Sequence, residues 1–315
     1  MRLLVTGGAG YIGSVVSRHL LEAGHRVIII DDLRAGQSSA TPQGATLHAG
    51  SINDRKFLDG LLPGADGVLH FAGSIEVETS MRCPLSHFRN NVEGTITLLE
   101  AMAAHNVERL IFSSTAAIYG QPVESPVAED HPLNPANPYG ESKLMVERVL
   151  RWLAQQGNLR FATLRYFNAA GGPLPDRKAV NLIPIVLEVA AGRRPYVEIF
   201  GTDYPTRDGT AVRDYVHVED LASGHLLALE ALESNRSLSY NLGTGTGFTV
   251  REVIETARQV TDAPIPVVES PRRAGDPAEV VATAQKIRDE LGWSPRYTDL
   301  HSIISSSWAS YTGPS

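Results

Sequence analysis

A glycine-rich turn between the first strand and the first helix restricts the fold of this 315-residue chain more than any other feature. The apolar run RLLVT (2–6) predicts a buried strand, and residues 11–23 carry apolar side chains at helical spacing. TGGAGYIG joins them, with Gly7, Gly10 and Gly13 three residues apart. At such a junction the first glycine permits a tight turn, the second lets a pyrophosphate approach the backbone, and the third lets helix and strand pack closely. The helix amino terminus adds unpaired N–H groups and a positive dipole, so the pattern predicts a phosphate-binding turn.

An acidic residue at the end of the second strand extends this prediction. Asp31 follows the β-branched run RVIII (26–30) and lies eighteen residues after Gly13. A carboxylate at this place accepts hydrogen bonds from an adenosine ribose and repels a 2′-phosphate. We therefore predict a dinucleotide site that favours NAD over NADP. Arg34 is the one nearby side chain that weakens this preference.

Strands and helices alternate through the first half of the chain. Apolar strands joined by connections of helix length are typical of a doubly wound parallel sheet, so the fold class is α/β with a Rossmann-type sheet. Strands are expected over 2–6, 26–30, 45–49, 67–73, 109–114 and 160–168, and helices over 11–23, 54–61, 88–105 and 138–155.

The pattern changes after Asn168, where the Gly/Pro-rich stretch AAGGPLPDRK is typical of a connector. We predict an NAD-binding Rossmann domain over 1–169 and a smaller mixed α/β domain, which binds the substrate, over 170–315. The boundary is soft, because residues 212–235 could pack back onto the first sheet. In the second domain, helices are expected near 181–191 and 249–260, strands over 196–200 and 239–243, a loop over 271–276 and a weak terminal helix.

Composition excludes several classes of partner. The net charge is −7, with 43% hydrophobic and 20% charged residues, as in an ordinary soluble protein. A nucleic acid or an anionic membrane needs a basic face, so neither is expected as a partner. No apolar window reaches the ~18 residues of a membrane span, and the single cysteine, Cys83, fits a reducing compartment. We expect a cytoplasmic protein.

One helix carries a candidate acid–base pair. NPYGESK places Tyr139 and Lys143 four residues apart, so both side chains project from the same helix face. A free phenol has a pKa of about 10 and is a poor base at neutral pH. A nearby lysine cation and a positively charged nicotinamide favour the phenolate, which then takes the proton from an alcohol as hydride leaves its carbon. Thr115, in FSSTAAIYG at a predicted strand end, is placed to orient that alcohol.

These motifs resemble one family along nearly the whole chain. TGGAGYIG, Asp31, HFAG, NNVEGT, FSSTAAIYG, NPYGESK, LRYFN, the run from FGTDYPTRDGT to VRDYVHVEDLA, and PRRAGDP are similar in order and spacing to the extended short-chain dehydrogenase/reductase family, most of all to its UDP-glucose (UDP-galactose) 4-epimerases. The resemblance implies NAD as cofactor. The cofactor-binding residues that it implies are Gly7, Gly10, Tyr11, Ile12, Gly13, Asp31, Phe71, Ala72, Gly73, Asn91, Ser113, Tyr139, Lys143 and Tyr166.

Two alanines after Thr115 narrow the reaction. In the relatives that dehydrate nucleotide sugars an Asp and a Glu occupy these two places, and the sugar-acid decarboxylases carry a Glu just after the hydroxyl residue. This chain has Ala116 and Ala117. A methyl group transfers no proton, so elimination and decarboxylation are disfavoured and reversible oxidation of one secondary alcohol remains. The alternative interpretation is that both alanines are packing residues at a helix start.

The resemblance also implies a nucleotide-sugar site in the C-terminal half. Arginine forks suit phosphate oxygens, and Phe200 is expected beside the uracil. Val280 aligns with the position that controls room for an N-acetyl group, and its intermediate size leaves the sugar open. The substrate-binding residues that it implies are Asn168, Asn181, Leu182, Phe200, Arg213, Tyr215, Arg273, Asp276 and Val280.

Three places depart from the family pattern. Ser51 stands where many members have an Asp near the adenine, and Ile75 replaces a lysine that some epimerases place near the phosphates. Ala35 and Gly36 replace a more polar adenosine loop. These departures bear on cofactor affinity more than on the chemistry.

The leading hypothesis is an NAD-dependent 4-epimerase of a UDP-hexose that works through a transient 4-keto intermediate. Thr115, Tyr139 and Lys143 are its catalytic residues, and Lys143 also holds the nicotinamide ribose. A nucleotide-sugar dehydrogenase or 4-ketoreductase with net NAD(H) turnover is the alternative, and the intact set disfavours a non-catalytic NAD-sensing module. The family analogy adds a homodimer built from a four-helix bundle. The ten histidines include no H-E-x-x-H pattern, so no metal is expected.

Overall fold

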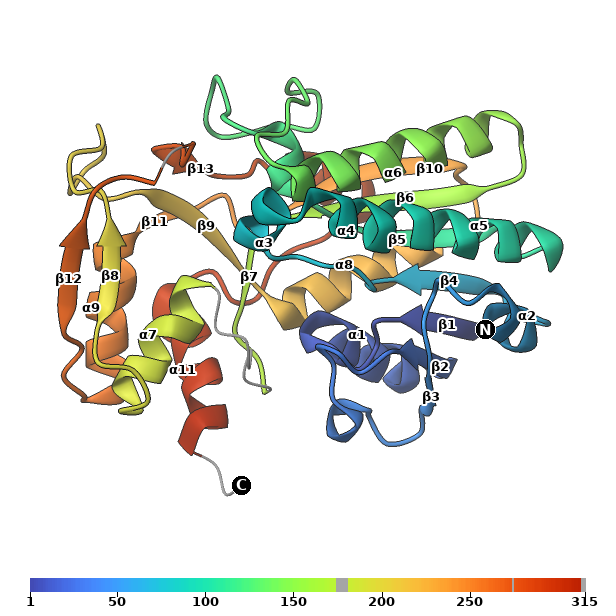
Figure 1. Cartoon of the computed structure of the whole chain (residues 1–315), viewed down its shortest axis with the longest axis horizontal. Helices are drawn as coiled ribbons and strands as arrows, with labels where there is room; N and C mark the ends of the chain where they lie inside the picture. Colours follow the sequence, from blue (N-terminus) through green and yellow to red (C-terminus); the bar gives the residue numbers. More distant parts are fainter. Residues whose placement is uncertain (174–180, 274, 313–315) are drawn as a thin grey trace. The chain divides into compact units, whose positions relative to one another are not determined.

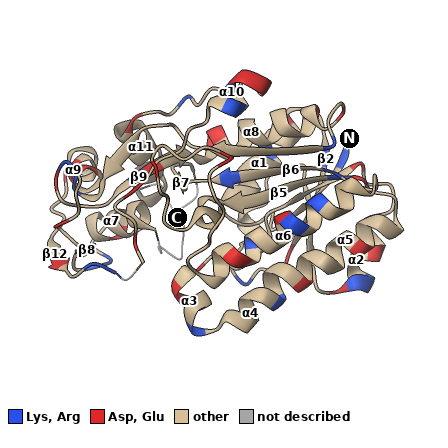
Figure 2. Ribbon diagram, turned by 90° about the horizontal axis from the view of Figure 1, so that it is seen from above, with Lys and Arg blue, Asp and Glu red and all other residues tan. Residues whose placement is uncertain are grey.

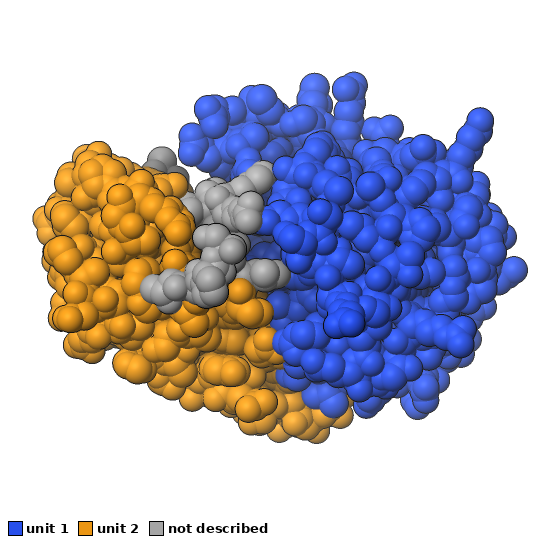
Figure 3. Space-filling model, turned by 90° about the horizontal axis from the view of Figure 1, so that it is seen from below, with its two compact units in different colours: residues 1–120, 133–165, 221–240 blue, residues 121–132, 166–220, 241–315 orange. Residues whose placement is uncertain are grey.

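In the computed structural model of the chain, residues 1–173, 181–273 and 275–312 are described. They form two compact units, each assembled from three stretches of chain (Figure 3). Residues 212–220 group with unit 2 and residues 221–240 with unit 1, and the division into functional domains 1–169 and 170–315 stays a prediction. The predicted connector lies outside the described residues from position 174 onward. Unit 1 comprises Met1–Gly120, Leu133–Arg165 and Leu221–Tyr240, and unit 2 comprises Gln121–Pro132, Tyr166–Asp220 and Asn241–Ser315.

Figure 1 labels the secondary-structure elements. The strands are β1 (Arg2–Thr6), β2 (Arg26–Asp31), β3 (Thr46–Ala49), β4 (Gly67–His70), β5 (Arg109–Thr115), β6 (Arg160–Tyr166), β7 (Asn168–Ala170), β8 (Val197–Phe200), β9 (Val212–His217), β10 (Ser237–Leu242), β11 (Gly247–Thr249), β12 (Val267–Ser270) and β13 (Glu279–Val280). The α-helices are α1 (Tyr11–Glu22), α2 (Arg55–Leu61), α3 (Val77–Arg82), α4 (Pro84–Phe88), α5 (Gly94–Ala104), α6 (Pro138–Gln155), α7 (Leu182–Ala190), α8 (Val218–Ala231), α9 (Val250–Thr261), α10 (Gln285–Leu291) and α11 (Leu300–Thr312). Two 3₁₀ turns, η1 (Ser38–Ala40) and η3 (Ala116–Tyr119), and a π-helical segment, η2 (Arg89–Glu93), complete the list.

Unit 1 is built on a seven-stranded sheet in the order β10-β6-β5-β4-β1-β2-β3. Strand β1 pairs in parallel with β2 on one side and β4 on the other, so the strand order reverses at β1. Ligands of doubly wound sheets bind outside the carboxyl ends of the strands at such a reversal. The doubly wound α/β prediction is confirmed, and the sheet places the glycine turn after β1 at this edge.

Helices cover both faces of the sheet (Figure 1). Helices α2, α5 and α6 share one face, where Leu58, Leu98 and Leu150 are completely buried in a common core with apolar side chains of β4 and β5. Helix α1 lies on the opposite face together with the part of α8 from Leu221 onward. This packing fixes the strand ends that carry the site.

Two predicted elements differ from the structure. The helix expected over 88–105 is interrupted, because the π-helical segment η2 lies between α4 and α5, and Pro84 begins α4 at a position that suits proline. The strand expected over 239–243 among the C-terminal elements is β10, and it forms an edge of the first sheet. Helix α6 has the bounds that the sequence predicts, with the Asn137 side chain accepting a 2.8 Å hydrogen bond from the Gly140 N–H.

Unit 2 holds a four-stranded sheet and a two-stranded sheet. Strand β9 pairs with β11 in antiparallel fashion and with β7 and β13 in parallel, and β8 pairs with β12 in parallel. Helices α7, α9 and α11 enclose the core of the unit around Val186, Val253 and Ile303. The register sets Val280 of β13 beside Arg213 of β9.

Charged residues of both signs alternate along α6 (Figure 2). Two of the ion pairs there join Arg148 to Glu141 and Arg151 to Glu147. None of the helices in the part of the chain that the structure describes is long and apolar enough to cross a membrane.

Candidate active site

The glycine turn after β1 is built from close backbone contacts. The Gly7 N–H donates a 2.7 Å hydrogen bond to the Ile30 carbonyl, and its φ of +70° lies in the left-handed region that favours glycine. A Cβ on Gly7 would lie 2.6 Å from the backbone nitrogen of Ala72, and one on Gly13 would lie 2.3 Å from the Gly7 carbonyl oxygen. Gly10 is the N-cap of α1, where Tyr11 and Ile12 begin the first turn. The turn therefore leaves a surface of bare backbone at a helix amino terminus, which suits a pyrophosphate.

Asp31 is fixed beside this turn. Its Oδ2 accepts a 3.1 Å hydrogen bond from the Ala9 N–H, and its Oδ1 accepts a 2.9 Å bond from the Leu33 N–H. Burial raises the pKa of its carboxyl, and these two backbone hydrogen bonds oppose the rise. A Cβ on Gly36 would lie 2.7 Å from both carboxylate oxygens, so glycine lets the backbone pass close to the carboxylate.

Arg34 has partners of its own. Its guanidinium forms a 2.6 Å ion pair with Asp32 and donates a 3.0 Å hydrogen bond to the Asn90 side-chain oxygen. Arg34, which weakens the prediction of NAD over NADP, is therefore paired with the carboxylate of Asp32, two residues away.

The segment after β4 meets the π-helical segment and α6. Asn91, in η2, accepts a 2.7 Å hydrogen bond from the Ser74 N–H and donates a 3.0 Å bond to the Ser142 hydroxyl. A Cβ on Gly73 would lie 3.2 Å from the Asn91 side-chain oxygen and 3.4 Å from the Lys143 amine. Three residues that the sequence predicts at the cofactor therefore lie together.

Phe71 and Ala72 precede that glycine, close to a buried histidine that the sequence analysis missed. His70 Nδ1 lies 2.6 Å from the Thr6 hydroxyl and His70 Nε2 lies 2.8 Å from the Thr95 hydroxyl. Burial lowers the pKa of His70 to about 3, so its ring is neutral at pH 7. His70 links β1, β4 and α5 beneath the site. Strand periodicity alone does not predict its contacts with Thr6 and Thr95.

The three predicted catalytic residues lie in unit 1, at the end of β5 and the start of α6. The Lys143 amine donates a 3.0 Å hydrogen bond to the Ser113 carbonyl, and burial lowers its pKa to about 8. The Tyr139 phenol is buried beside the Thr115 side chain, whose interaction with it acts to lower its pKa. The Thr115 hydroxyl oxygen also accepts a 3.1 Å bond from the Ala117 N–H, which caps η3 and fixes the threonine rotamer.

The pKa of Tyr139 in the protein without NAD bears on its predicted role as a base. The sequence predicts that a lysine cation and a positively charged nicotinamide together favour the phenolate. Without the nicotinamide, burial raises the pKa of this phenol, and the interaction with Thr115 opposes the rise only in part. The protein groups by themselves therefore keep Tyr139 protonated at neutral pH.

The structure bears on both interpretations of the two alanines, as the loss of proton-transfer groups and as packing residues at a helix start. Ala116 and Ala117 form the first half of η3 and are partly exposed. A Cβ on Gly140 would lie 2.6 Å from the Ala117 carbonyl oxygen, so η3 and α6 pack backbone against backbone. The turn is a packing element, and its two side chains offer no proton donor or acceptor beside Thr115.

A buried ion pair supports the strand end and escaped the sequence analysis. Arg165 donates hydrogen bonds of 3.1 and 2.8 Å to the two carboxylate oxygens of Glu147 and a 2.8 Å bond to the Tyr119 hydroxyl. The Ser114 hydroxyl, next to Thr115, donates a 2.6 Å bond to the same carboxylate. This network ties β5, η3, α6 and β6 together.

Three of the predicted substrate residues of unit 2 are Arg213 on β9, Phe200 at the end of β8 and Arg273 after β12. Arg213 donates 2.8 and 3.0 Å hydrogen bonds to the Val212 and Pro277 carbonyls, and burial lowers its pKa. The Arg273 guanidinium lies 4.7 Å from the centre of the Phe200 ring and donates a 2.8 Å bond to Asp276. The two arginines provide an electropositive cluster bordered by an aromatic ring.

The other predicted substrate residues take different positions in the unit. The Asn168 amide donates a 3.0 Å hydrogen bond to the Asp214 carbonyl, and Tyr215 is buried on β9, where burial raises its pKa. Asn181 is the exposed N-cap of α7, and Leu182 is the first residue of that helix. Tyr166, predicted at the cofactor, is a buried residue at the end of β6.

Asp214 is a buried carboxylate that the sequence analysis overlooked. It accepts hydrogen bonds from the N–H groups of Thr244, Gly245 and Ala282 at 2.8 to 3.1 Å and from the Thr244 hydroxyl. These bonds fix β9 and therefore the neighbouring Arg213. Within residues 1–173, 181–273 and 275–312, no group of three or more His, Cys, Asp or Glu side chains is placed to hold a metal ion.

Comparisons with known proteins agree with this geometry. Residues 3–243 match the model of the NAD dependent epimerase/dehydratase family. A UDP-glucose 4-epimerase of Halalkalibacterium halodurans is 47% identical over 98% of this chain and 95% of its own length. A Stenotrophomonas maltophila UDP-glucose-4-epimerase with bound NAD and formylated UDP-arabinopyranose superposes with a TM-score of 0.94, at 42% identity over 99% of this chain and 98% of its own. A Bifidobacterium longum UDP-glucose 4-epimerase in complex with NAD⁺ and UDP gives a TM-score of 0.92, at 36% identity and the same coverage.

Proposed function

Since the chain belongs to the NAD dependent epimerase/dehydratase family, we propose that it is an NAD-dependent 4-epimerase of a UDP-hexose that works through a transient 4-keto intermediate. The observation that carries this proposal is the buried pair of Tyr139 and Thr115, in electrostatic contact, with the buried Lys143 on the same helix and two methyl groups at residues 116 and 117. The similar proteins of known activity are UDP-glucose 4-epimerases along almost their entire length. NAD is the cofactor, and the bare glycine turn and the Asp31 carboxylate fit it.

The catalytic roles follow from these contacts. When bound beside these residues, NAD would supply the hydride acceptor for C4 and the hydride donor for the 4-ketone. Thr115 orients the C4 hydroxyl, and Tyr139 takes its proton and gives it back. Burial alone leaves Tyr139 protonated, so a positive charge must offset the raised pKa of the phenol. Lys143, with a pKa of about 8, is still mostly a cation at pH 7 and supplies part of that charge while it binds the nicotinamide ribose.

Epimerisation is favoured over elimination and over net dehydrogenation for chemical reasons. Elimination needs an acid and a base next to the threonine, and residues 116 and 117 provide neither. Net dehydrogenation would require release of NADH after each turnover.

We assign NAD to residues 1–169, and the UDP-sugar to residues 170–315, where Phe200, Arg213 and Arg273 provide an aromatic face and two cations for a uridine diphosphate.

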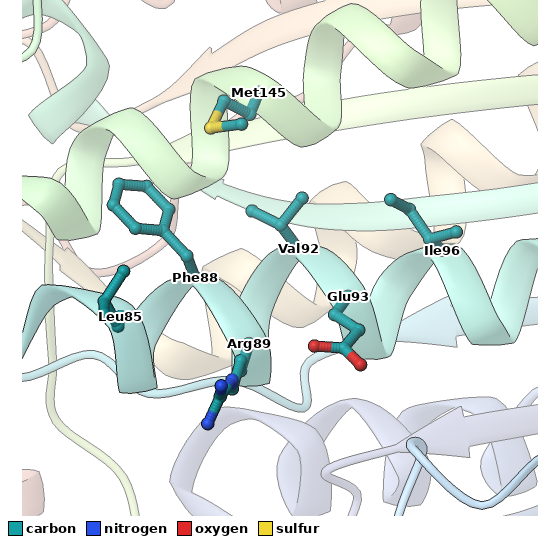
Figure 4. A pocket seen from close by; sticks show the side chains of 7 residues that line it. All are labelled: Leu85, Phe88, Arg89, Val92, Glu93, Ile96 and Met145. Carbon is teal, nitrogen blue, oxygen red and sulfur yellow. The ribbon is translucent and has the colours of Figure 1, made fainter.

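A second copy of the chain is the proposed partner. Leu85, Phe88, Val92 and Ile96 line a shallow hollow along α4, η2 and α5, and Met145 of α6 closes it. Figure 4 shows Phe88, Val92 and Ile96 pointing toward Met145, with Arg89 and Glu93 at the opposite margin. Leu85 is 73% exposed, which is unusual for a leucine beside other apolar side chains.

This surface suits the four-helix bundle that the family analogy predicts. Met145→Glu places a charge in the apolar hollow, and we expect it to convert a dimer into a monomer in light scattering after gel filtration. Lys56→Glu, on the exposed side of α2, is the matched control and leaves the dimer intact. A wild-type chain that is monomeric at micromolar concentration would contradict the dimer. We also propose a cytoplasmic location, which the single, exposed and unpaired Cys83 supports.

The function is tested by incubating the purified protein with UDP-galactose and with UDP-N-acetylgalactosamine, each with a trace of NAD. We expect the 4-epimer of at least one sugar to form without accumulation of NADH, and the sugar that reacts shows how much room Val280 leaves. NADH that rises in step with substrate loss would identify a dehydrogenase. Absence of both changes with both sugars would contradict the proposed substrate class.

A further inference from the structure

Two consecutive arginines in unit 2 make the same kind of contact with two aromatic residues. Arg273 lies over the Phe200 ring at 4.7 Å and bonds Asp276. Arg272 lies over the Tyr204 ring at 4.2 Å. The family pattern assigns a ligand contact to Arg273 and none to Arg272, although Arg272 makes the closer ring contact.

Arg272 also holds the loop that begins at Phe200. Its Nε donates a 2.7 Å hydrogen bond to the Asp203 carboxylate, and a terminal nitrogen donates to the Asp203 backbone carbonyl. The guanidinium therefore contacts the carboxylate and the carbonyl of Asp203 and the ring of the next residue, Tyr204. Arg272 also holds the pKa of the Asp203 carboxyl below its usual range.

The backbone of the loop is shaped around this arginine. Gly201 has a φ of +87°, and a Cβ there would lie 2.6 Å from both the Arg272 Cγ and the Tyr204 ring. The Gly201 N–H donates a 2.8 Å bond to the Ser270 carbonyl, which is the last link of the β8–β12 pair. Beyond that link the two segments are no longer joined by the sheet. Arg272 joins them through Asp203 and Tyr204, and Arg273 joins them through Phe200.

We propose that Arg272 is a positioning residue that holds Phe200 and Arg273 in place for a uridine diphosphate. The inference rests on the proposed function and deepens it. Phe200 and Arg273 lie at the ends of the two segments that Arg272 joins, so their separation depends on its contacts. A ring and a guanidinium that are already stacked bind a nucleotide without the entropy cost of ordering two loops.

The test measures UDP binding by calorimetry on the NAD-loaded enzyme. Arg272→Leu removes the fork and the charge, and we expect the Kd for UDP to rise about tenfold, which corresponds to about 1.4 kcal/mol. The KM for the UDP-sugar rises by a similar factor, while kcat changes less than twofold and the bound NAD is retained. Arg272→Lys keeps the charge without the planar fork, so its Kd lies between those of wild type and Arg272→Leu.

Three further variants separate the ring contact from general surface charge. Tyr204→Phe keeps the ring, and since the buried hydroxyl has no hydrogen-bond partner among the described residues, UDP binding stays within twofold of wild type. Tyr204→Leu removes the ring and weakens UDP binding as Arg272→Leu does. Arg251→Leu is the matched control, because Arg251 is as exposed as Arg272 and also pairs with a carboxylate, Glu269, but lies over no aromatic ring among the described residues.

The outcomes are distinct. If wild type binds UDP and Arg272→Leu binds it within twofold, Arg272 has no positioning role. Equal weakening by Arg251→Leu would also overturn the inference, because the effect would then be one of net charge. If the NAD-loaded wild type does not bind UDP, the proposed function itself fails and the inference fails with it.

Discussion

Replacing the buried Lys143 by methionine should abolish turnover and at the same time stabilise the fold. Its amine is buried and donates a 3.0 Å hydrogen bond to a neutral carbonyl, that of Ser113. Burial lowers the pKa from 10.5 to about 8. A tenfold change in a protonation equilibrium corresponds to about 1.4 kcal/mol, so keeping this lysine charged at pH 7 costs about 3 kcal/mol. Loss of the hydrogen bond offsets about 1 kcal/mol, and the expected net gain is about 2 kcal/mol.

The pH dependence of this gain has a definite sign. The unfolded lysine keeps its proton up to about pH 10.5, whereas the folded lysine loses it near pH 8. The cost in the wild type is therefore complete below pH 8 and disappears as the pH rises from 8 to 10.5. The extra stability of Lys143→Met should decline over the same interval.

Urea unfolding of the NAD-free proteins at several pH values measures this difference. Lys56→Met, on the exposed surface of α2, is the control and should change the free energy of unfolding by less than about 0.5 kcal/mol. If Lys143→Met is less stable than wild type at pH 7, or if its advantage is the same at pH 7 and pH 10.5, the reasoning from burial of the charge is wrong.

Two further substitutions test the architecture of unit 1. Gly13→Ala puts a Cβ 2.3 Å from a carbonyl oxygen of the turn. We expect this variant to lose NAD on gel filtration and to lose about 2 kcal/mol of unfolding free energy. Gly60→Ala, in α2 with no atom within 4 Å of the new Cβ, is the control and should be neutral or stabilising. Arg165→Met removes the buried cation of the Glu147 carboxylate and leaves it only the half-exposed Arg151, at 3.3 Å, as an ion-pair partner. Urea unfolding should show a loss of about 3 kcal/mol, most of which returns when Glu147→Met is added. No recovery in the double variant would refute the ion-pair explanation.

The sequence predicts best the parts of the site that depend on local backbone rules. The glycine turn, the strand end at Asp31 and helix α6 all follow from spacing within one element or between two neighbours in the chain. The pair Tyr139 and Lys143 follows from helix geometry, because residues four apart share a face. In each case a short segment carries its own structural information.

Features that join distant segments were not predicted. Glu147 and Arg165 lie on a helix and a strand, and neither periodicity nor composition pairs them. The π-helical segment η2 escapes a periodicity analysis because one wide turn barely changes the apolar pattern, yet it sets the direction of Asn91. The raised pKa of Tyr139 depends on burial, which a sequence motif does not report.

The most direct test of the central claim follows the hydrogen at C4 of the sugar. The protein is incubated with UDP-galactose that carries deuterium at C4, in ordinary water with a trace of unlabelled NAD, and the product is analysed by NMR and mass spectrometry. The account predicts UDP-glucose with the deuterium still at C4, because the hydride leaves and returns within one active site. Product without deuterium, or deuterium that accumulates in free NADH, would contradict it.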